Sequence, residues 1–429
     1  MKYSYSWIFF IVLCSFNVGA TENPSAHVPG SGPNYISPDY SDNLLGDWGG
    51  RRADMSARGY DWELLYKLDL LSNTASTSRN SYALDNLDVK LALDGEKIFG
   101  IAGGSGLLYI LSNQGGKPAI KSDRLPHGVD NIETPENANT VKLYQAWLQQ
   151  TFLDEKLSIL AGLYDLNSEF YVNEAAGIFI HPTFGIGAEF AGTGKNGPSI
   201  FPNTSLAIRV KAELARGYYL MAATMDGVPG DPNNPHGTHL QFNQGDGALN
   251  VIEAEFPLGI SDDPHDNKMT FGVWRYTAHF DDLLDQDVNA MPIQRVSQGY
   301  YFTAEKVFGY SSITNEESWR GFIRAGKNDG NTTQFDMAWS AGLSLEAPFA
   351  DRDKDIVGIA VAQERNAVKY RAVPGNSQVT HENSFELTYR YHAMGGVVLQ
   401  PVVQYLLNHS NDPAQDKSWW LGMRFEVSL

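Results

Sequence analysis

The sequence has 429 residues, of which 42% are hydrophobic and 19% are charged, and its formal net charge is -18. So acidic a chain is unsuited to binding nucleic acid, because phosphate is held through clustered Lys and Arg. No apolar run is long enough for a bundle of membrane-spanning helices, each of which needs about 20 apolar residues. A membrane β-barrel is not excluded, because apolar and polar residues alternate along its strands and form no long apolar run.

The first twenty residues have the pattern of a secretory signal peptide. Lys2 gives the positive start, an apolar stretch runs from Trp7 to Phe16, and residues 18–20 are a small-residue cleavage site. The only cysteine, Cys14, lies in this segment. We therefore expect an exported mature chain that is held together without disulfides.

Residues 21–59 are predicted to form a periplasmic lead-in with one short helix. Proline, serine, asparagine and glycine dominate up to about residue 45, which is typical of a loosely ordered segment. Residues 51–58 then suit one short helix that Gly59 would end. The rest of the chain, residues 60–429, is predicted to form a single transmembrane β-barrel domain.

From Tyr60 onward the hydropathy alternates with a period of two, as it does in a strand with one apolar face. In residues 206–214, for example, apolar side chains alternate with Arg209, Lys211 and Glu213. Residues 335–346 place Phe335 on the apolar, lipid-facing side, and residues 104–113 and 217–225 alternate poorly. The segments expected to be strands are 60–72, 86–95, 104–113, 141–152, 157–165, 204–214, 217–225, 248–257, 267–277, 298–307, 319–328, 333–347, 355–364, 382–392, 396–406 and 417–428.

This pattern predicts an all-β fold, a 16-stranded antiparallel transmembrane barrel with long extracellular loops and a short N-terminal periplasmic helix. Many segments are long enough for a tilted strand to cross a bilayer, which takes about 9–11 residues. The alternative is a soluble β protein with a solvated sheet face. The long connections on one side include 114–140, 166–203 and 278–297, and most connections on the other side are short.

The connection formed by residues 166–203 is predicted to be a constriction loop. It carries six aromatic residues, and the barrel interior is the place where they could pack, so we expect this loop to fold inward and narrow a water-filled lumen. Basic residues on neighbouring strands (Lys67, Lys90, Lys142, Arg424) would then oppose Asp165, Glu169 and Glu174 of the loop. The other expected lumen residues are Arg209, Lys211, Glu213, Glu386 and Arg390.

The chain resembles the carbohydrate-selective outer-membrane porin family, the OprB family. The resemblance covers most of the chain from about residue 45, and it implies a sixteen-stranded porin that passes mono- and small oligosaccharides by facilitated diffusion. One departure is Leu429, where such barrels end in an aromatic residue that the assembly machinery recognises. The segments that carry the resemblance include Gly46-Asp47-Trp48-Gly49-Gly50, Gly162-Leu163-Tyr164-Asp165-Leu166-Asn167, Gly197-Pro198-Ser199-Ile200, Asp226-Gly227-Val228-Pro229-Gly230-Asp231 and Gly422-Met423-Arg424.

We therefore predict a passive sugar channel in the outer membrane of a Gram-negative bacterium, with no catalytic residue, metal or cofactor. Two alternatives stay open: a general porin without sugar preference, which would also pass ions, and a β-rich glycan-acting enzyme. The expected partners are carbohydrate solutes, outer-membrane lipids and lipopolysaccharide, and the barrel-assembly machinery, with no nucleic acid. A homotrimer is one open option for the assembly.

Overall fold

The computed structural model describes residues 40, 42–73, 81–115, 128–134, 139–259, 267–310, 317–408 and 417–429. The predicted signal peptide, residues 1–20, lies outside the described residues. None of the helices in these ranges is long and apolar enough to span a membrane.

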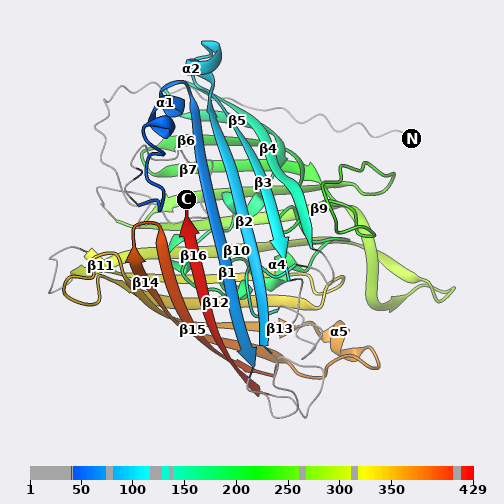
Figure 1. Ribbon diagram of the computed structural model, residues 1–429. Helices are drawn as coiled ribbons and strands as arrows, with labels where there is room; N and C mark the ends of the chain where they lie inside the picture. The colour runs from blue at the N-terminus through cyan, green and yellow to red at the C-terminus, as the bar shows by residue number, and fades with distance from the viewer. Residues whose placement is uncertain are drawn as a thin grey trace.

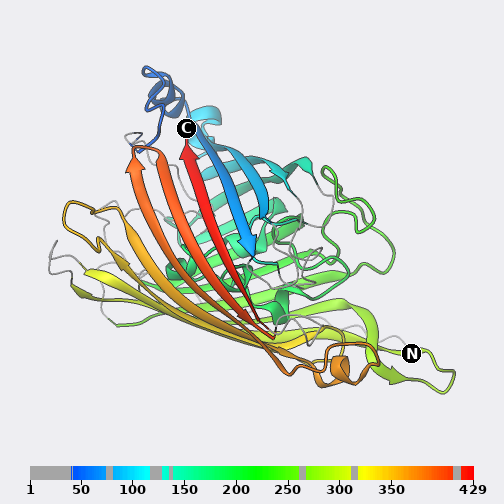
Figure 2. The same cartoon turned by 60° about the horizontal axis from the view of Figure 1, so that its bottom comes forward.

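The chain forms a closed antiparallel barrel of sixteen strands, in which each strand pairs with its sequence neighbours and β1 pairs with β16 (Figures 1 and 2). The predicted fold class is confirmed. The strands are β1 Tyr60–Asn73, β2 Ser81–Asp94, β3 Gly104–Gln114, β4 Thr140–Phe152, β5 Leu157–Tyr164, β6 Ser205–Ala215, β7 Tyr218–Asp226, β8 Ala248–Pro257, β9 Lys268–Gln286, β10 Pro292–Tyr310, β11 Glu317–Asn328, β12 Phe335–Glu346, β13 Ile356–Asn366, β14 His381–Met394, β15 Val397–Leu407 and β16 Lys417–Ser428.

The helices among the described residues are short and lie at the barrel rims or inside it. Helix α1 follows the N-terminal lead-in and α2 connects β2 to β3, while α5 lies beside β9 (Figure 2). The segment between β5 and β6 contributes α4 and three turns of 3₁₀ helix. Their bounds are α1 Arg51–Ala57, α2 Gly95–Phe99, α4 Ala188–Ala191, α5 Val368–Ala372, η1 Leu166–Ser168, η2 Glu174–Ala176 and η3 Pro182–Phe184.

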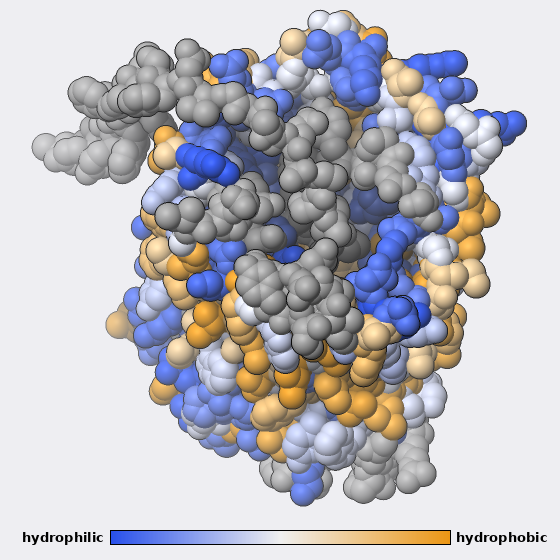
Figure 3. Space-filling model, turned by 90° about the vertical axis from the view of Figure 1, so that its left-hand side faces the viewer, coloured by the Kyte–Doolittle hydropathy of each residue, from blue (hydrophilic) through white to orange (hydrophobic). Residues whose placement is uncertain are grey.

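The two faces of the barrel wall have opposite chemistry. On β6, Ile208 is 53% exposed on the outside, whereas its neighbour Arg209 is 1% exposed on the inside. The same contrast holds on β14, where Leu387 is exposed and Glu386 is buried. Hydrophobic side chains gather over the side of the barrel in Figure 3. A closed barrel with an apolar exterior and a polar interior is the arrangement that a bilayer requires.

The strand positions predicted from the sequence agree with the structure except at one hairpin, β9–β10. β9 and β10 have 19 residues each, so most of the expected loop 278–297 is strand, and only residues 287–291 form the tip. Hydropathy alternation fails here because acidic residues and leucines follow one another in pairs, Asp281-Asp282 and Leu283-Leu284, instead of alternating. Ion pairs hold the hairpin in place: Asp282 accepts from Arg295 at 3.0 Å and from Lys369 of α5 at 2.5 Å.

The sequence predicts that Phe335 faces lipid, but in the structure its ring faces the barrel interior. A register shift lies between Phe335 and Met337 in the β12–β13 pairing. Because side chains alternate along a strand, the shift turns the Phe335 ring inward, where it is buried against Ala188 of α4 and Ala338.

The N-terminal segment lies against the seam where β1 meets β16 (Figure 1). Arg52 of α1 donates to the Leu429 carbonyl at 2.8 Å and to the Trp62 carbonyl at 2.5 Å. The Leu44 backbone N–H donates to the Ser428 carbonyl at 2.7 Å. Ser428 and Leu429 are thus held by residues of the N-terminal segment.

Candidate solute pathway

The long segment between β5 and β6 folds into the barrel, as the sequence predicts (Figure 1). Its Phe170, Tyr171 and Phe190 are fully buried in a core whose other side is the inner wall of β6–β10. The Phe190 ring stacks on Trp274 of β9 with ring centroids 4.7 Å apart. This explains why 217–225 alternates poorly in the sequence: on β7 the inward residues, such as Met221 and Met225, contact apolar loop residues instead of water.

Three glutamates of the wall hold the backbone of this loop. Glu253 of β8 accepts from the Tyr171 N–H at 2.8 Å, and Glu305 of β10 accepts from the Ala175 N–H at 2.9 Å. On the opposite wall, Glu386 of β14 accepts from two successive N–H groups, those of residues 180 and 181, at 2.7 and 2.8 Å. The loop therefore crosses the lumen from β8 to β14, and each carboxylate supplies an acceptor to backbone groups that are cut off from water.

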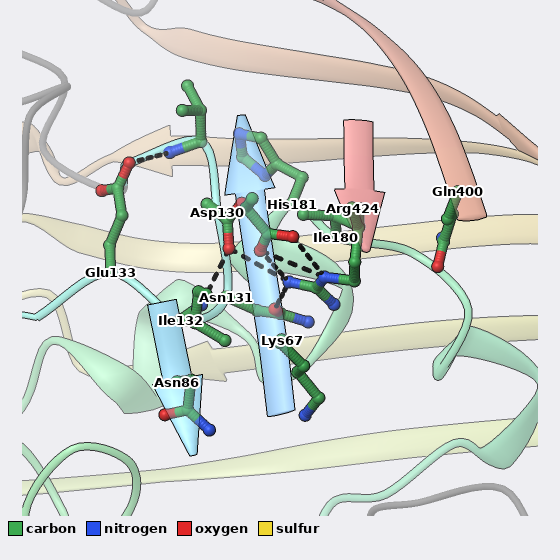
Figure 4. A network of polar contacts seen from close by, with 12 residues as sticks. Lys67, Asn86, Asp130, Asn131, Ile132, Glu133, Ile180, His181, Gln400 and Arg424 are labelled. Carbon is green, nitrogen blue, oxygen red and sulfur yellow. Dashed lines mark hydrogen bonds and ion pairs between the residues drawn. The ribbon is translucent and has the colours of Figure 1, made fainter. Parts of the chain in front are cut away.

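A second inward segment, residues 128–134, follows β3 and was not expected from the sequence. Arg424 of β16 binds Asp69 at 2.6 Å and reaches Asp130 at 3.2 Å and the Asn131 side chain at 2.7 Å (Figure 4). The Asn131 N–H donates to the Ile180 carbonyl of the long loop at 2.8 Å. The two inward segments thus meet inside the barrel. Burial of the Asp130 carboxyl at this place raises its pKa well above the usual range.

The loop acids Asp165, Glu169 and Glu174 bind partners other than the strand cations predicted to oppose them. Glu169 of the loop binds Arg209 of β6 at 2.8 Å, with both side chains buried. Glu174 lies 3.6 Å from Lys268 of β9, and Asp165 accepts from the Tyr144 hydroxyl at 2.6 Å. The loop acids are thus bound by groups on β4, β6 and β9. Burial raises the pKa of Asp165 to about 6.

The expected cations are bound locally as well. Lys67 lies 3.6 Å from Asp88, and Lys90 lies 2.8 Å from Glu63. Lys142 donates to the Asn203 side chain at 2.9 Å and to the Pro202 carbonyl at 3.1 Å. The remaining predicted residues also line the interior: Arg390 binds Glu426 at 2.5 Å, Lys211 lies 5.0 Å from the Tyr219 ring centroid, and Glu213 is partly accessible.

Accessibility separates the groups that meet water from those that hold the fold. The side chains of Lys67, Lys90 and Glu63 retain 19%, 22% and 34% exposure, while those of Arg209 and Arg424 retain 1% and 7%. Asn131 of the second inward segment is exposed. Partly accessible charged groups thus lie on the β1–β2 wall, with the exposed Asn131 on the segment that comes from the β3–β4 connection. Others lie at the end of the barrel where β6 meets β7 and β11 begins: Lys211, Glu213, Arg320 and Glu346. Within the described ranges, no group of three His, Cys, Asp or Glu side chains is arranged to hold a metal ion.

Comparisons with known proteins agree with this architecture. Residues 79–429 match the family model described as "Carbohydrate-selective porin, OprB family". The chain is 23% identical to Porin B of Pseudomonas aeruginosa over 417 residues, or 90% of each chain, and 21% identical to the putative porin QuiX of Acinetobacter baylyi over 420 residues, or 90% of this chain and 93% of that protein. The high-pH structure of Pseudomonas putida OprB superposes with a TM-score of 0.79 at 20% identity, covering 91% of this chain and 99% of that one.

Proposed function

Since the chain belongs to the carbohydrate-selective OprB porin family, we propose that sugars cross its barrel along the β1–β2 wall, between Lys67, Lys90 and Glu63 on one side and Asn131 on the other. The protein is an outer-membrane porin, and its family and its barrel indicate a channel rather than an enzyme.

The observation that carries this assignment is the division of the barrel interior. Loop residues and apolar wall residues of β6–β10 fill one side and leave it dry. The β1–β2 wall keeps charged side chains that are bound to a partner and still reach water. A solute that follows the water must therefore pass these groups.

The chemistry of these groups suits a neutral, hydroxyl-rich solute. Lys90–Glu63 and Lys67–Asp88 are pairs of opposite sign, so this wall carries little net charge and a strong local field. Such a field orients the dipoles of a polar solute at close range without favouring one sign of ion. The Asn131 amide offers both a donor and an acceptor to the opposite side of a sugar.

The test is liposome swelling with the purified full chain, comparing glucose and a disaccharide with amino acids of matched size. We expect faster swelling in the sugars, and a lower sugar rate in Lys67→Ala and Lys90→Ala. The control is Lys327→Ala, since Lys327 is exposed on the outward face of β11. Sugar rates equal to those of the amino acids would leave a general porin, and lysine variants that behave like the control would place the pathway elsewhere.

A further inference from the structure

A groove of about 690 Å³ opens on the outward face of β10–β14. Small residues form its floor: Ala304 of β10, Gly321 of β11 and Ala341 of β12. Bulky side chains border it, among them Phe308 and Phe385, which are about two-fifths exposed. The groove therefore faces the hydrocarbon of the bilayer and has the walls and floor of an elongated apolar site.

The sequence builds this depression by omitting side chains on adjacent strands. At Gly321 an added Cβ would come within 3.0 Å of the Phe308 ring and 3.1 Å of a Leu343 methyl group, so these two side chains already approach the glycine closely and a larger residue would have to displace them. Exposed Leu, Ile and Phe side chains are frequent on the outer face, for example at Leu148, Ile208 and Phe271. A smooth lipid-facing wall needs no such gap.

Two charged residues of β10 line the groove: the Glu305 side chain turns into the barrel and binds the Ala175 N–H, whereas Lys306 lies on the outward face. Lys306 is exposed, and among the described residues no acidic side chain pairs with it. Lys306 pairs in register with Gly321, four residues before the end of β10 at Tyr310 and two residues from the Phe308–Trp319 pair. That end is the periplasmic end of the strand, and Trp319 suits the interfacial aromatic belt. A lysine at this depth can extend its charge to the headgroup level.

We propose that the groove binds a phospholipid of the periplasmic leaflet, with one acyl chain over Ala304, Gly321 and Ala341 and its phosphate bound by Lys306. Charge complementarity selects this occupant. The Lys306 ammonium group, which no acidic side chain of the described residues pairs with, is suited to an anion, and an apolar groove within the bilayer is filled most favourably by hydrocarbon. A second copy of the chain would have to bury that ammonium group against an apolar wall.

The experiment is native mass spectrometry of the full chain in detergent, titrated with phosphatidylglycerol or with diacylglycerol of the same acyl chains. A single lysine near an anionic headgroup is worth about fivefold in affinity, so we expect one phosphatidylglycerol per chain to be retained about fivefold more strongly than diacylglycerol. Lys306→Gln should remove this preference, and Ala341→Leu should weaken the binding of both lipids by filling the floor.

The control variant is Lys327→Gln, which removes an outward cation near the other end of β11. It should bind both lipids as the original chain does, and all variants should keep the heat-dependent gel shift of a folded barrel. An equal preference for phosphatidylglycerol in Lys306→Gln would overturn the proposal. So would an Ala341→Leu variant that changes the number of chains per particle and leaves lipid binding unaltered, because the groove would then be an interface between copies.

Discussion

The two sides of the barrel interior are built on the same kind of strand and have opposite roles. On β6–β10 the apolar inward residues, such as Met221 and Trp274, pack against Phe170, Tyr171 and Phe190 of the long loop and form a dry core. On β16, β1 and β2 they are charged and bound in pairs, and part of this wall stays wet. The interior of a porin barrel need not be polar all round: here one side anchors a loop, and we propose that the other carries solute.

The largest effect is expected from damage to the dry side. Phe190→Ala removes a fully buried ring that stacks on Trp274, and a buried Phe→Ala change costs about 3–5 kcal/mol. We expect a lower thermal midpoint and easier proteolysis within the loop. Phe271→Ala, which trims a ring that is 49% exposed on the outside of β9, is the matched control. Equal midpoints for the two variants would show that the loop core contributes no stability.

The next effect concerns the attachment of the loop on the far wall. Glu386→Ala leaves the N–H groups of Ile180 and His181 without their acceptor, at a cost of about 1–3 kcal/mol for an unsatisfied buried group. Glu386→Gln keeps one side-chain oxygen and should cost less. Hydrogen exchange at these two amides measures the release directly. Unchanged protection in the alanine variant would mean that the contact does not hold the loop.

A pH effect of intermediate size is expected from Glu189 of α4. Burial raises the pKa of Glu189 to about 7 from 4.5, and its carboxyl accepts from the Tyr171 hydroxyl at 2.8 Å. A carboxyl whose pKa is raised by folding binds more protons in the folded state. Its stabilising contribution is therefore complete below about pH 4.5 and is lost as the pH rises through about 7.

Glu189→Gln should remove that part of the pH dependence. Thermal midpoints between pH 4.5 and 8 would then fall less steeply with rising pH in the variant than in the original chain. Parallel curves for the two proteins would contradict the assignment.

The smallest effect is expected on the wet side, where the ion pairs are partly exposed and an exposed pair contributes about 0–1 kcal/mol to stability. Lys90→Gln leaves Glu63 unpaired beside the solute path, so the reversal potential in a salt gradient should shift toward cation preference. Glu63→Gln should shift it toward anions, with little change in thermal midpoint for either variant. Shifts of the same sign in both variants, or none, would remove this pair from the pathway.

The comparison of the two sides also explains what could be predicted. Alternation with a period of two located the strands because it depends only on whether each face meets lipid or the interior. It weakened on β3 and β7 because their inward residues, such as Leu111 and Met221, are apolar as well. The aromatic content of the 166–203 segment was enough to predict that it folds inward, since six rings need a dry place.

The sequence by itself determined the barrel, the number of its strands and the inward loop, because these follow from local hydropathy and from the need to pair every backbone group in lipid. Tertiary structure alone decided the contacts: that Glu169 binds Arg209, that residues 128–134 enter the lumen to meet Arg424, and that Phe335 turns inward. Such contacts join residues far apart in the chain, and they depend on strand register and on the path of the loop across the closed barrel, which no local pattern encodes.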